Sequence, residues 1–77
     1  MTRPISRIAL NLLGVFEAIY SRGGVTAAAR HLHLTQSAIS HSLAKLRVAF
    51  DDELFVRFGN AMVPTALARA IIGPVRD

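Results

Sequence analysis

Apolar side chains recur along this sequence at regular spacings that predict its elements. Between residues 8 and 21 the spacing is helical, which predicts a first helix. The apolar residues on this helix are Ile8, Leu12, Phe16 and Ile19. The RGG sequence at residues 22–24 ends it, because a cation suits the last turn and glycine suits the position beyond. Residues 1–7 are expected to form a flexible start, since Pro4 should block an earlier helix.

Two helices joined by a tight turn are predicted next. Thr26 can act as the N-cap of a short second helix that ends near Leu32. The three alanines after Thr26 allow another helix to approach closely, as a helix-turn-helix requires. The turn covers residues 33–35, and Thr35 then caps a third helix over residues 36–50.

The third helix has two distinct faces when its residues are placed at about 100° each. One face is a ridge of large apolar side chains, namely Ile39, Leu43, Leu46 and Phe50. The other face carries small or polar side chains, namely Ser37, Ser40, His41 and Ala44. A globular core needs only the ridge, so the compact polar face indicates a helix that enters a DNA groove.

A small β-hairpin, or wing, is predicted after the third helix. Residues 54–57 are short, apolar and aromatic, which is typical of a strand. Gly59-Asn60 can form a tight turn, and residues 61–63 can return as the partner strand, which Pro64 ends.

Thr65 is a suitable N-cap for a fourth helix, which Gly73-Pro74 should weaken or stop. The predicted fold class is mainly α, a winged helix-turn-helix with a three-helix core, a small β-hairpin wing and the start of a C-terminal linker helix. We expect residues 1–64 to form the winged domain and residues 65–77 to begin the linker helix.

The large apolar residues fall into two groups. The predicted core comprises Phe16, Leu32, Ile39, Leu43, Leu46, Leu54 and Phe55. The members of the second group belong either to the core or to a dimer surface, and they are Leu10, Leu13, Leu67 and Ile71. A chain of 77 residues buries only a marginal core by itself, which favours dimerisation or a partner domain.

Composition and charge narrow the function. Apolar residues make up 52% of the chain, which argues against disorder, and the lack of cysteine excludes disulfides and thiolate zinc sites. The net charge of +4 is modest, but the acids cluster at residues 51–53. Residues 1–50 therefore carry six Lys and Arg side chains against one acid, Glu17, which suits a polyanionic partner.

Other classes of function find little support. No apolar run approaches a length of about 18 residues, which a membrane span requires, and the N-terminus lacks a signal-peptide cleavage site. His31 and His33 lack a third metal ligand, and Ser40-His41 lacks an orienting acid. We expect no enzyme, no metal and no cofactor, and a cytoplasmic location.

Two motifs give the chain a resemblance to a known family. Residues 28–40 follow the pattern AAxxLxxxQSAxS, and LFxR follows at residues 54–57. Further matching residues are Leu10, Asn11, Leu12, Leu13, Phe16, Thr26, Leu43, Leu46, Pro64 and Thr65. Over nearly its whole length, the chain resembles the N-terminal DNA-binding domain of LysR-type transcriptional regulators.

The chain departs from the family pattern at three places. Arg47 follows Leu46 where the family often has glutamate, and Val63-Pro64-Thr65 stands where Leu-Thr is common. Both variants resemble the nodulation-regulator branch. His41 stands where arginine is common, so no arginine contact to guanine is implied there.

The resemblance implies duplex DNA as the partner, with an interrupted palindrome as the target. It also implies a homodimer formed through the helix after the wing, and a tetramer for a full-length regulator. The family's larger effector-binding domain, which would sense a small molecule, is absent from this sequence. We therefore expect a piece or remnant of a longer regulator, with weak dimerisation of its own.

Residues on the polar face of the third helix are the predicted base contacts. They are Gln36, Ser37, Ser40 and His41. Gln36 can pair with adenine through two hydrogen bonds, whereas the two serines and His41 can bond to bases or phosphates. A purely solvated surface is the alternative for all four.

A second group is predicted to contact the DNA backbone. It consists of Thr26, Arg30, Thr35, Lys45 and Arg57. Helix N-termini at the two threonines can bind phosphate, and the cations suit phosphates better than bases. For Arg57, a phosphate or minor-groove contact competes with a salt bridge to Asp51, Asp52 or Glu53.

The remaining alternative is a winged-helix protein-interaction module that does not bind DNA, which the modest net charge permits. The salt dependence of binding distinguishes the two functions. Affinity for DNA falls steeply with added salt, whereas affinity at an apolar protein interface barely changes.

Overall fold

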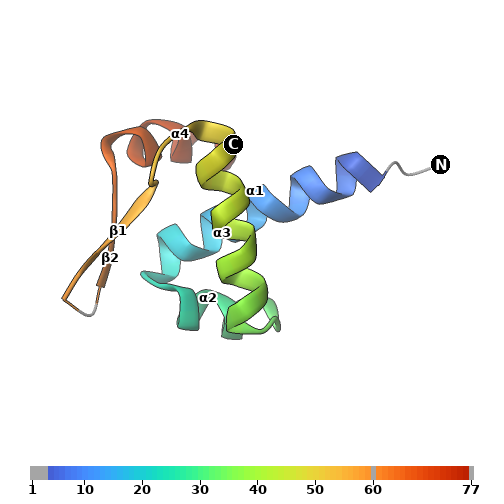
Figure 1. The fold of residues 1–77 in the computed structure, drawn as a ribbon, viewed down its shortest axis with the longest axis horizontal. Coiled ribbons are helices and arrows are strands. Elements are labelled where there is room, and N and C mark those ends of the chain that lie inside the picture. The colour runs from blue at the N-terminus through green and yellow to red at the C-terminus, as the bar shows by residue number, and fades with distance from the viewer. Residues whose placement is uncertain (1–3, 60, 77) are drawn as a thin grey trace.

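The computed structural model describes residues 4–59 and 61–76, with side chains from Leu12 onward within those ranges. Four helices and one antiparallel hairpin follow one another along the chain (Figure 1). They are α1 (Pro4–Arg22), α2 (Val25–Leu32), α3 (Gln36–Phe50), β1 (Phe55–Phe58), β2 (Ala61–Pro64) and α4 (Ala66–Arg76). The mainly α, winged helix-turn-helix fold predicted from the sequence is confirmed.

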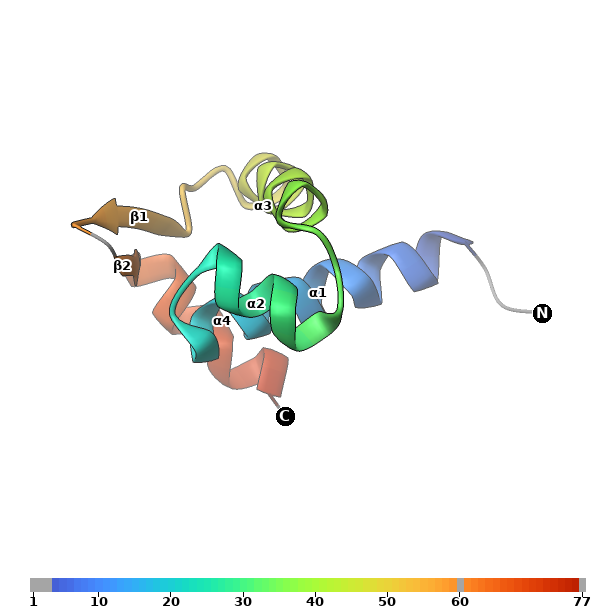
Figure 2. The ribbon, with the colours of Figure 1, turned by 90° about the horizontal axis from the view of Figure 1, so that it is seen from below.

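α1 is the central element, and α2, α3 and α4 all pack against it. Figure 2 shows α3 on one side of this assembly and α4 on the opposite side, with α1 and α2 between them. The hairpin projects from the end of the molecule away from the N-terminus. α3 and the hairpin therefore lie beside each other on one face.

α1 begins earlier than predicted. It starts at Pro4 rather than near Ile8, because proline at the first position of a helix needs no N–H partner and already has a helical φ. The predicted end is confirmed. Gly23 has a φ of +84° and its N–H donates to the Ile19 carbonyl at 2.9 Å.

The N-cap predicted for α2 is wrong. Gly24 is the N-cap, no side chain caps the helix, and Thr26 lies inside its first turn. The helix begins two residues earlier than predicted, at Val25, and the Ala28 N–H is bonded to the Gly24 carbonyl at 3.1 Å. The hydroxyl of Thr26 is thereby left exposed rather than used as a cap.

α3 has the boundaries that the sequence predicts. Thr35 Oγ1 accepts a hydrogen bond from the Ala38 N–H at 3.0 Å, as an N-cap should. The preceding turn is closed by His33, whose φ is +58°, and by a bond from the Leu34 N–H to the Ala29 carbonyl at 2.9 Å.

The hairpin is displaced by one residue from its predicted start. Leu54 has a φ of +66°, which no strand residue adopts, so β1 begins at Phe55. Arg57 pairs with Met62 across the hairpin, and Val56 pairs with Val63. In the predicted Gly59-Asn60 turn, Gly59 has a φ of +65°, while Asn60 lies outside the described residues.

One core joins α1, α3, the hairpin and α4. Its largest fully buried side chains are Phe16, Phe55, Ile19, Ile39, Leu46 and Leu54. The Phe16 and Phe55 rings lie 5.5 Å apart between centroids, and Tyr20 lies 6.1 and 6.3 Å from them. This aromatic cluster fixes the base of the hairpin to α1.

The predicted core is largely confirmed, with a few differences. Leu32 is only partly buried, because it sits at the end of the short α2. Leu67 and Ile71 are also partly buried, whereas Leu13 is exposed. The side chain of Leu10 is not among those that the structure describes. Smaller buried residues were not predicted, namely Val15, Ala18, Ala68 and Ile72.

α4 is capped as predicted, since Thr65 Oγ1 accepts from the Ala68 N–H at 3.2 Å. Gly73-Pro74, which was expected to weaken or stop the helix, does not stop it, and the helix continues to Arg76. Arg76 Nε lies 3.3 Å from Glu17 Oε2, and its guanidinium stands 5.3 Å from the Tyr20 ring centroid. These contacts with α1 support the last turn past the proline.

No helix in the described ranges is both long and apolar enough to cross a membrane.

We expect Thr35→Ala to lower the free energy of unfolding by about 1 kcal/mol, because it removes the cap of α3. Thr26→Ala is the matched control, and it should change that free energy by less than about 0.5 kcal/mol. Urea denaturation followed by circular dichroism measures both. Equal losses would show that the two threonines do not differ in capping.

Candidate nucleic-acid interface

α3 separates its polar and apolar residues as the sequence predicts. Ile39, Leu43 and Leu46 are at most 4% exposed and form the side that packs on the core. The four predicted base contacts are all exposed, and they are Gln36, Ser37, Ser40 and His41. Burial of the apolar ridge therefore leaves the polar face outward.

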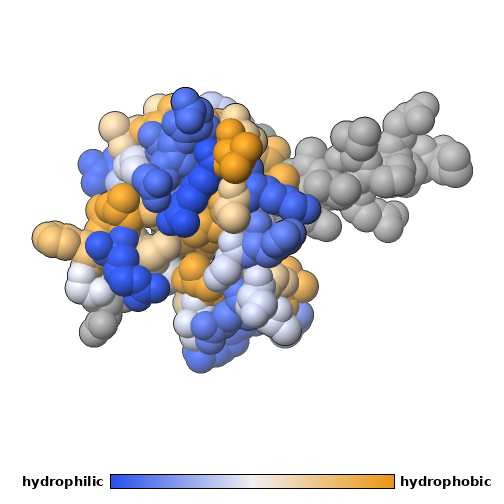
Figure 3. All heavy atoms as spheres, in the orientation of Figure 1, coloured by the Kyte–Doolittle hydropathy of each residue, from blue (hydrophilic) through white to orange (hydrophobic). Residues whose placement is uncertain are grey.

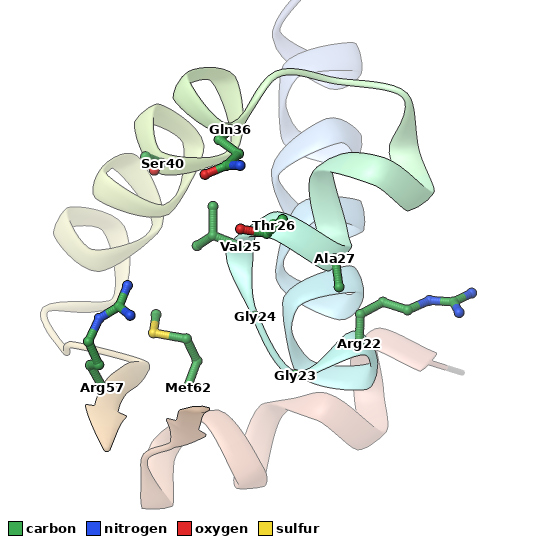
Figure 4. Close-up of a pocket in the computed structure, with 10 residues that line it drawn as sticks. All are labelled: Arg22, Gly23, Gly24, Val25, Thr26, Ala27, Gln36, Ser40, Arg57 and Met62. Carbon is green, nitrogen blue, oxygen red and sulfur yellow. The ribbon is translucent and has the colours of Figure 1, made fainter. Parts of the chain in front are cut away.

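A cleft of about 350 Å³ opens between the start of α2, the first turns of α3 and the hairpin. Gln36 and Ser40 line it from α3, Thr26 from α2, and Arg57 and Met62 from the two strands (Figure 4). The arginine and the methionine point from the hairpin toward α3. Four of the predicted contact residues thus share one cleft although they come from three elements.

The start of α2 adds backbone groups to this cleft. The lining includes Gly24, Val25 and Ala27. The first N–H groups of a helix have no partner within it and favour an anion nearby. Thr26, although it is not a cap, places its hydroxyl beside these groups.

The other predicted contact residues lie outside the cleft. Ser37 is exposed on the first turn of α3, Thr35 is exposed just before it, and Arg30 is exposed on α2. His41 and Lys45 border a separate shallow groove of about 360 Å³ along the outer side of α3. That groove is also lined by Ala44, Val48 and Ala49.

Hydrophilic and hydrophobic residues are interspersed over the face that carries α3 and the hairpin (Figure 3). Val48, near the C-terminal end of α3, is 82% exposed, so this face is not uniformly polar. Polar residues occur in both halves of α3, from Gln36 in its first turn to the exposed Lys45 in its second half.

Arg57 does not make the salt bridge that competed with a DNA contact. Among the described residues, Glu53 pairs instead with Arg47, with Nε 3.6 Å from Oε1. Asp52 Oδ2 accepts from the Leu54 N–H and from the Thr65 hydroxyl. The guanidinium of Arg57 is consequently left toward the cleft.

His31 lies in the last turn of α2, and His33 is its C-cap. His31 lies beside Arg22, whose Nη2 is 3.0 Å from the histidine Nδ1. Within residues 4–59 and 61–76, no group of three or more metal-ligating side chains comes together.

Sequence reasoning missed two residues of this region. Met62 lines the cleft beside Arg57, with which it pairs in the hairpin, next to the Phe58–Ala61 pair. Arg47 is bonded to the turn that leads into β1. The sequence shows that Arg47 stands where the family often has glutamate. It does not show which groups Arg47 would hydrogen-bond.

Comparison with known proteins places this geometry in a family. Residues 10–69 match the family model described as bacterial regulatory helix-turn-helix protein, lysR family. The chain belongs to the LysR family. This confirms the resemblance carried by the residues 28–40 and 54–57.

The curated relatives of this LysR-family chain are much longer than the chain itself. It is 44% identical to the HTH-type transcriptional regulator LeuO of Escherichia coli, over 100% of the chain and 25% of the relative. It is 47% identical to Nodulation protein D 1 of Bradyrhizobium diazoefficiens, over 88% of the chain and 22% of the relative. The chain thus spans about a quarter of the relatives it matches.

Solved structures share the fold of this LysR-family chain. A probable transcriptional regulator from Pseudomonas aeruginosa is 46% identical with a TM-score of 0.86, over 94% of this chain and 24% of that one. A complex of the CbnR DNA-binding domain with DNA shows 27% identity and a TM-score of 0.81. There the match covers 87% of this chain and 77% of the CbnR chain.

The division of α3 into two faces can be tested by stability alone. Leu43→Ala should lower the free energy of unfolding by about 2–5 kcal/mol, because it empties a buried site. Ser40→Ala, three residues earlier on the exposed face, should change it by less than about 0.5 kcal/mol. Urea denaturation of both variants makes the comparison, and a large loss for Ser40→Ala would mean that this face is not free.

Proposed function

We propose that this chain binds duplex DNA with sequence preference, as the DNA-binding part of a LysR-type transcriptional regulator. The observation that carries the proposal is the joint exposure of Gln36, Ser37, Ser40 and His41 on α3 beside the cleft that Arg57 enters. A helix with its apolar side anchored and compact polar groups outward suits the major groove. The CbnR domain, which has the same fold, is known in complex with DNA.

In this proposal the first turns of α3 read base edges. Gln36 pairs with adenine through its amide, which offers one donor and one acceptor side by side. Ser37, Ser40 and His41 are short enough to let the helix backbone approach the bases. Helix-turn-helix proteins place the N-terminal residues of this helix against the groove floor.

The remaining predicted contacts would hold the DNA backbone. Arg30, Lys45 and Arg57 supply charge for phosphates, and Arg57 can also reach a minor groove from the hairpin. Thr26 offers its hydroxyl beside the free N–H groups of α2. The Thr35 hydroxyl, which accepts from Ala38, can still donate its own proton to a phosphate.

The whole regulator would be a homodimer, or a tetramer at full length, in the bacterial cytoplasm where the chromosome lies. Residues 1–64 would form the winged domain, and residues 65–77 would begin the linker helix between protomers. A small-molecule effector would act only through a further domain. The chain's coverage of about a quarter of each relative supports this arrangement.

Replacing Gln36 should change which sequences bind. Selection from a random-sequence duplex pool should give a defined preference for wild type, with a relaxed adenine position for Gln36→Ala. Loss of one paired base contact corresponds to about 1–3 kcal/mol of discrimination at that position. An unchanged preference would remove Gln36 from the base contacts.

Replacing Arg57 should weaken binding to all duplexes by a similar factor. Arg57→Ala should also reduce the slope of log affinity against log salt by about one unit, because one phosphate contact is lost. Arg69→Ala, which removes an exposed cation from α4, is the charge-matched control and should leave the slope unchanged. Fluorescence anisotropy titrations at several salt concentrations measure the slope, and wild-type binding that ignores salt would favour the protein-interaction alternative.

A further inference from the structure

The chain makes an unusual turn between α3 and the hairpin. Leu54 is fully buried, yet its φ is +66°, a region that bulky side chains rarely adopt. The Phe55 N–H bonds back to the Glu53 carbonyl at 2.7 Å, so residues 53–55 form a γ-turn of the strained, positive-φ kind. A strained turn persists only where surrounding contacts hold it.

Arg47 supplies two of these contacts from the last turn of α3. Its Nε donates to the Glu53 carbonyl at 2.8 Å, and its Nη2 donates to the Phe55 carbonyl at 3.0 Å. The side chain is only 36% exposed. A planar guanidinium has fixed donor positions, so it holds the two carbonyls on either side of Leu54 at a set separation.

Asp52 holds the same turn from its other side. Its Oδ2 accepts from the Leu54 N–H at 2.8 Å and from the Thr65 hydroxyl at 2.7 Å. The Thr65 N–H donates to the Leu54 carbonyl at 2.9 Å. Both backbone polar groups of Leu54 are therefore bonded.

The turn sets the direction of β1, and β1 carries Arg57. Phe55 and Arg57 are two residues apart, so they share one face of the strand. Phe55 is fully buried in the aromatic cluster, and Arg57 continues that face into the cleft beside α3. Any rotation at the start of a four-residue strand would be carried to the guanidinium two residues later.

We propose that Arg47 is a positioning residue for DNA binding, which holds the carbonyls on either side of Leu54 so that Arg57 meets the DNA backbone. This inference rests on the proposed DNA-binding function. In this proposal Arg47 acts through Arg57 and does not itself touch DNA, and two of its five guanidinium N–H groups are held by carbonyls of the turn. A direct phosphate contact by Arg47 predicts different results in the experiment below.

The test is a double-mutant cycle with Arg47→Met and Arg57→Ala. The probe is the duplex that the wild-type chain selects from a random-sequence pool, and affinity and salt slope are measured for each variant. Each single variant should bind about tenfold more weakly, the loss expected for one hydrogen bond to a charged group. The double variant should bind like Arg57→Ala within a factor of about two, as coupled residues do.

Two further variants separate positioning from charge. Arg47→Lys keeps the charge but loses the two-pronged guanidinium, so it should resemble Arg47→Met. Arg69→Met removes a charge elsewhere and should lose less than about twofold in both backgrounds, as expected for an uncoupled site. Arg47→Met should lower the slope of log affinity against log salt by about one unit when Arg57 is present. It should leave that slope unchanged when Arg57→Ala is already in place.

The outcomes distinguish this inference from the function on which it rests. If wild type selects no duplex, the DNA-binding function fails. The second case is that wild type binds and Arg57→Ala weakens binding. If the double variant then loses about a hundredfold in affinity, the two single losses are independent and the positioning role is overturned. Wild-type affinity for Arg47→Met overturns it as well. Circular dichroism checks folding, and if Arg47→Met is unfolded, the same cycle with Arg47→Lys decides.

Discussion

The rotation of α3 about its own axis is the constraint on which this molecule depends. Ile39, Leu43 and Leu46 are buried against α1 and α2, and burying each side chain is worth about 1.5–3 kcal/mol. Turning the helix by half a revolution would expose all three and bury serine, histidine and glutamine without partners. The orientation of the polar face thus follows from the free energy gained by burying the apolar residues on the opposite face.

A second constraint concerns the hairpin, which by itself is too short to be stable. It is held by Phe55 in the aromatic cluster with Phe16 and Tyr20, and by the hydrogen bonds around Leu54. Burial of Phe55 is not directional, and it fixes the position of the hairpin on the core. The hydrogen bonds around Leu54 are directional, and they fix the orientation of the hairpin.

Local signals in the sequence were enough for much of this structure. The bounds of α3 were predictable because Thr35 is a strong cap and the apolar ridge repeats over about three turns. The exposure of Gln36, Ser37, Ser40 and His41 followed from the same periodicity. The turn at residues 22–24 was equally clear, since glycine tolerates the positive φ that Gly23 adopts.

What could not be predicted depends on contacts between distant residues. Thr26 has the right chemistry for a cap, but the N-cap of α2 lies two residues earlier, at Gly24. Gly73-Pro74 was expected to weaken or stop α4, but the helix continues to Arg76, whose side chain contacts Tyr20 and Glu17 on α1. The cleft gathers residues from α2, α3 and the hairpin, and no spacing along the chain shows their proximity.

The single carboxylate of Asp52 serves two elements at once, the entrance to β1 and the cap of α4. The hairpin and α4 are therefore not independent appendages of the three-helix core. Both are hydrogen-bonded to the same Asp52 carboxylate. A displacement of α4 would therefore also act on the turn at Leu54, where the hairpin begins. Because Ala68 and Ile72 of α4 are buried, the same displacement would also reach the hydrophobic core.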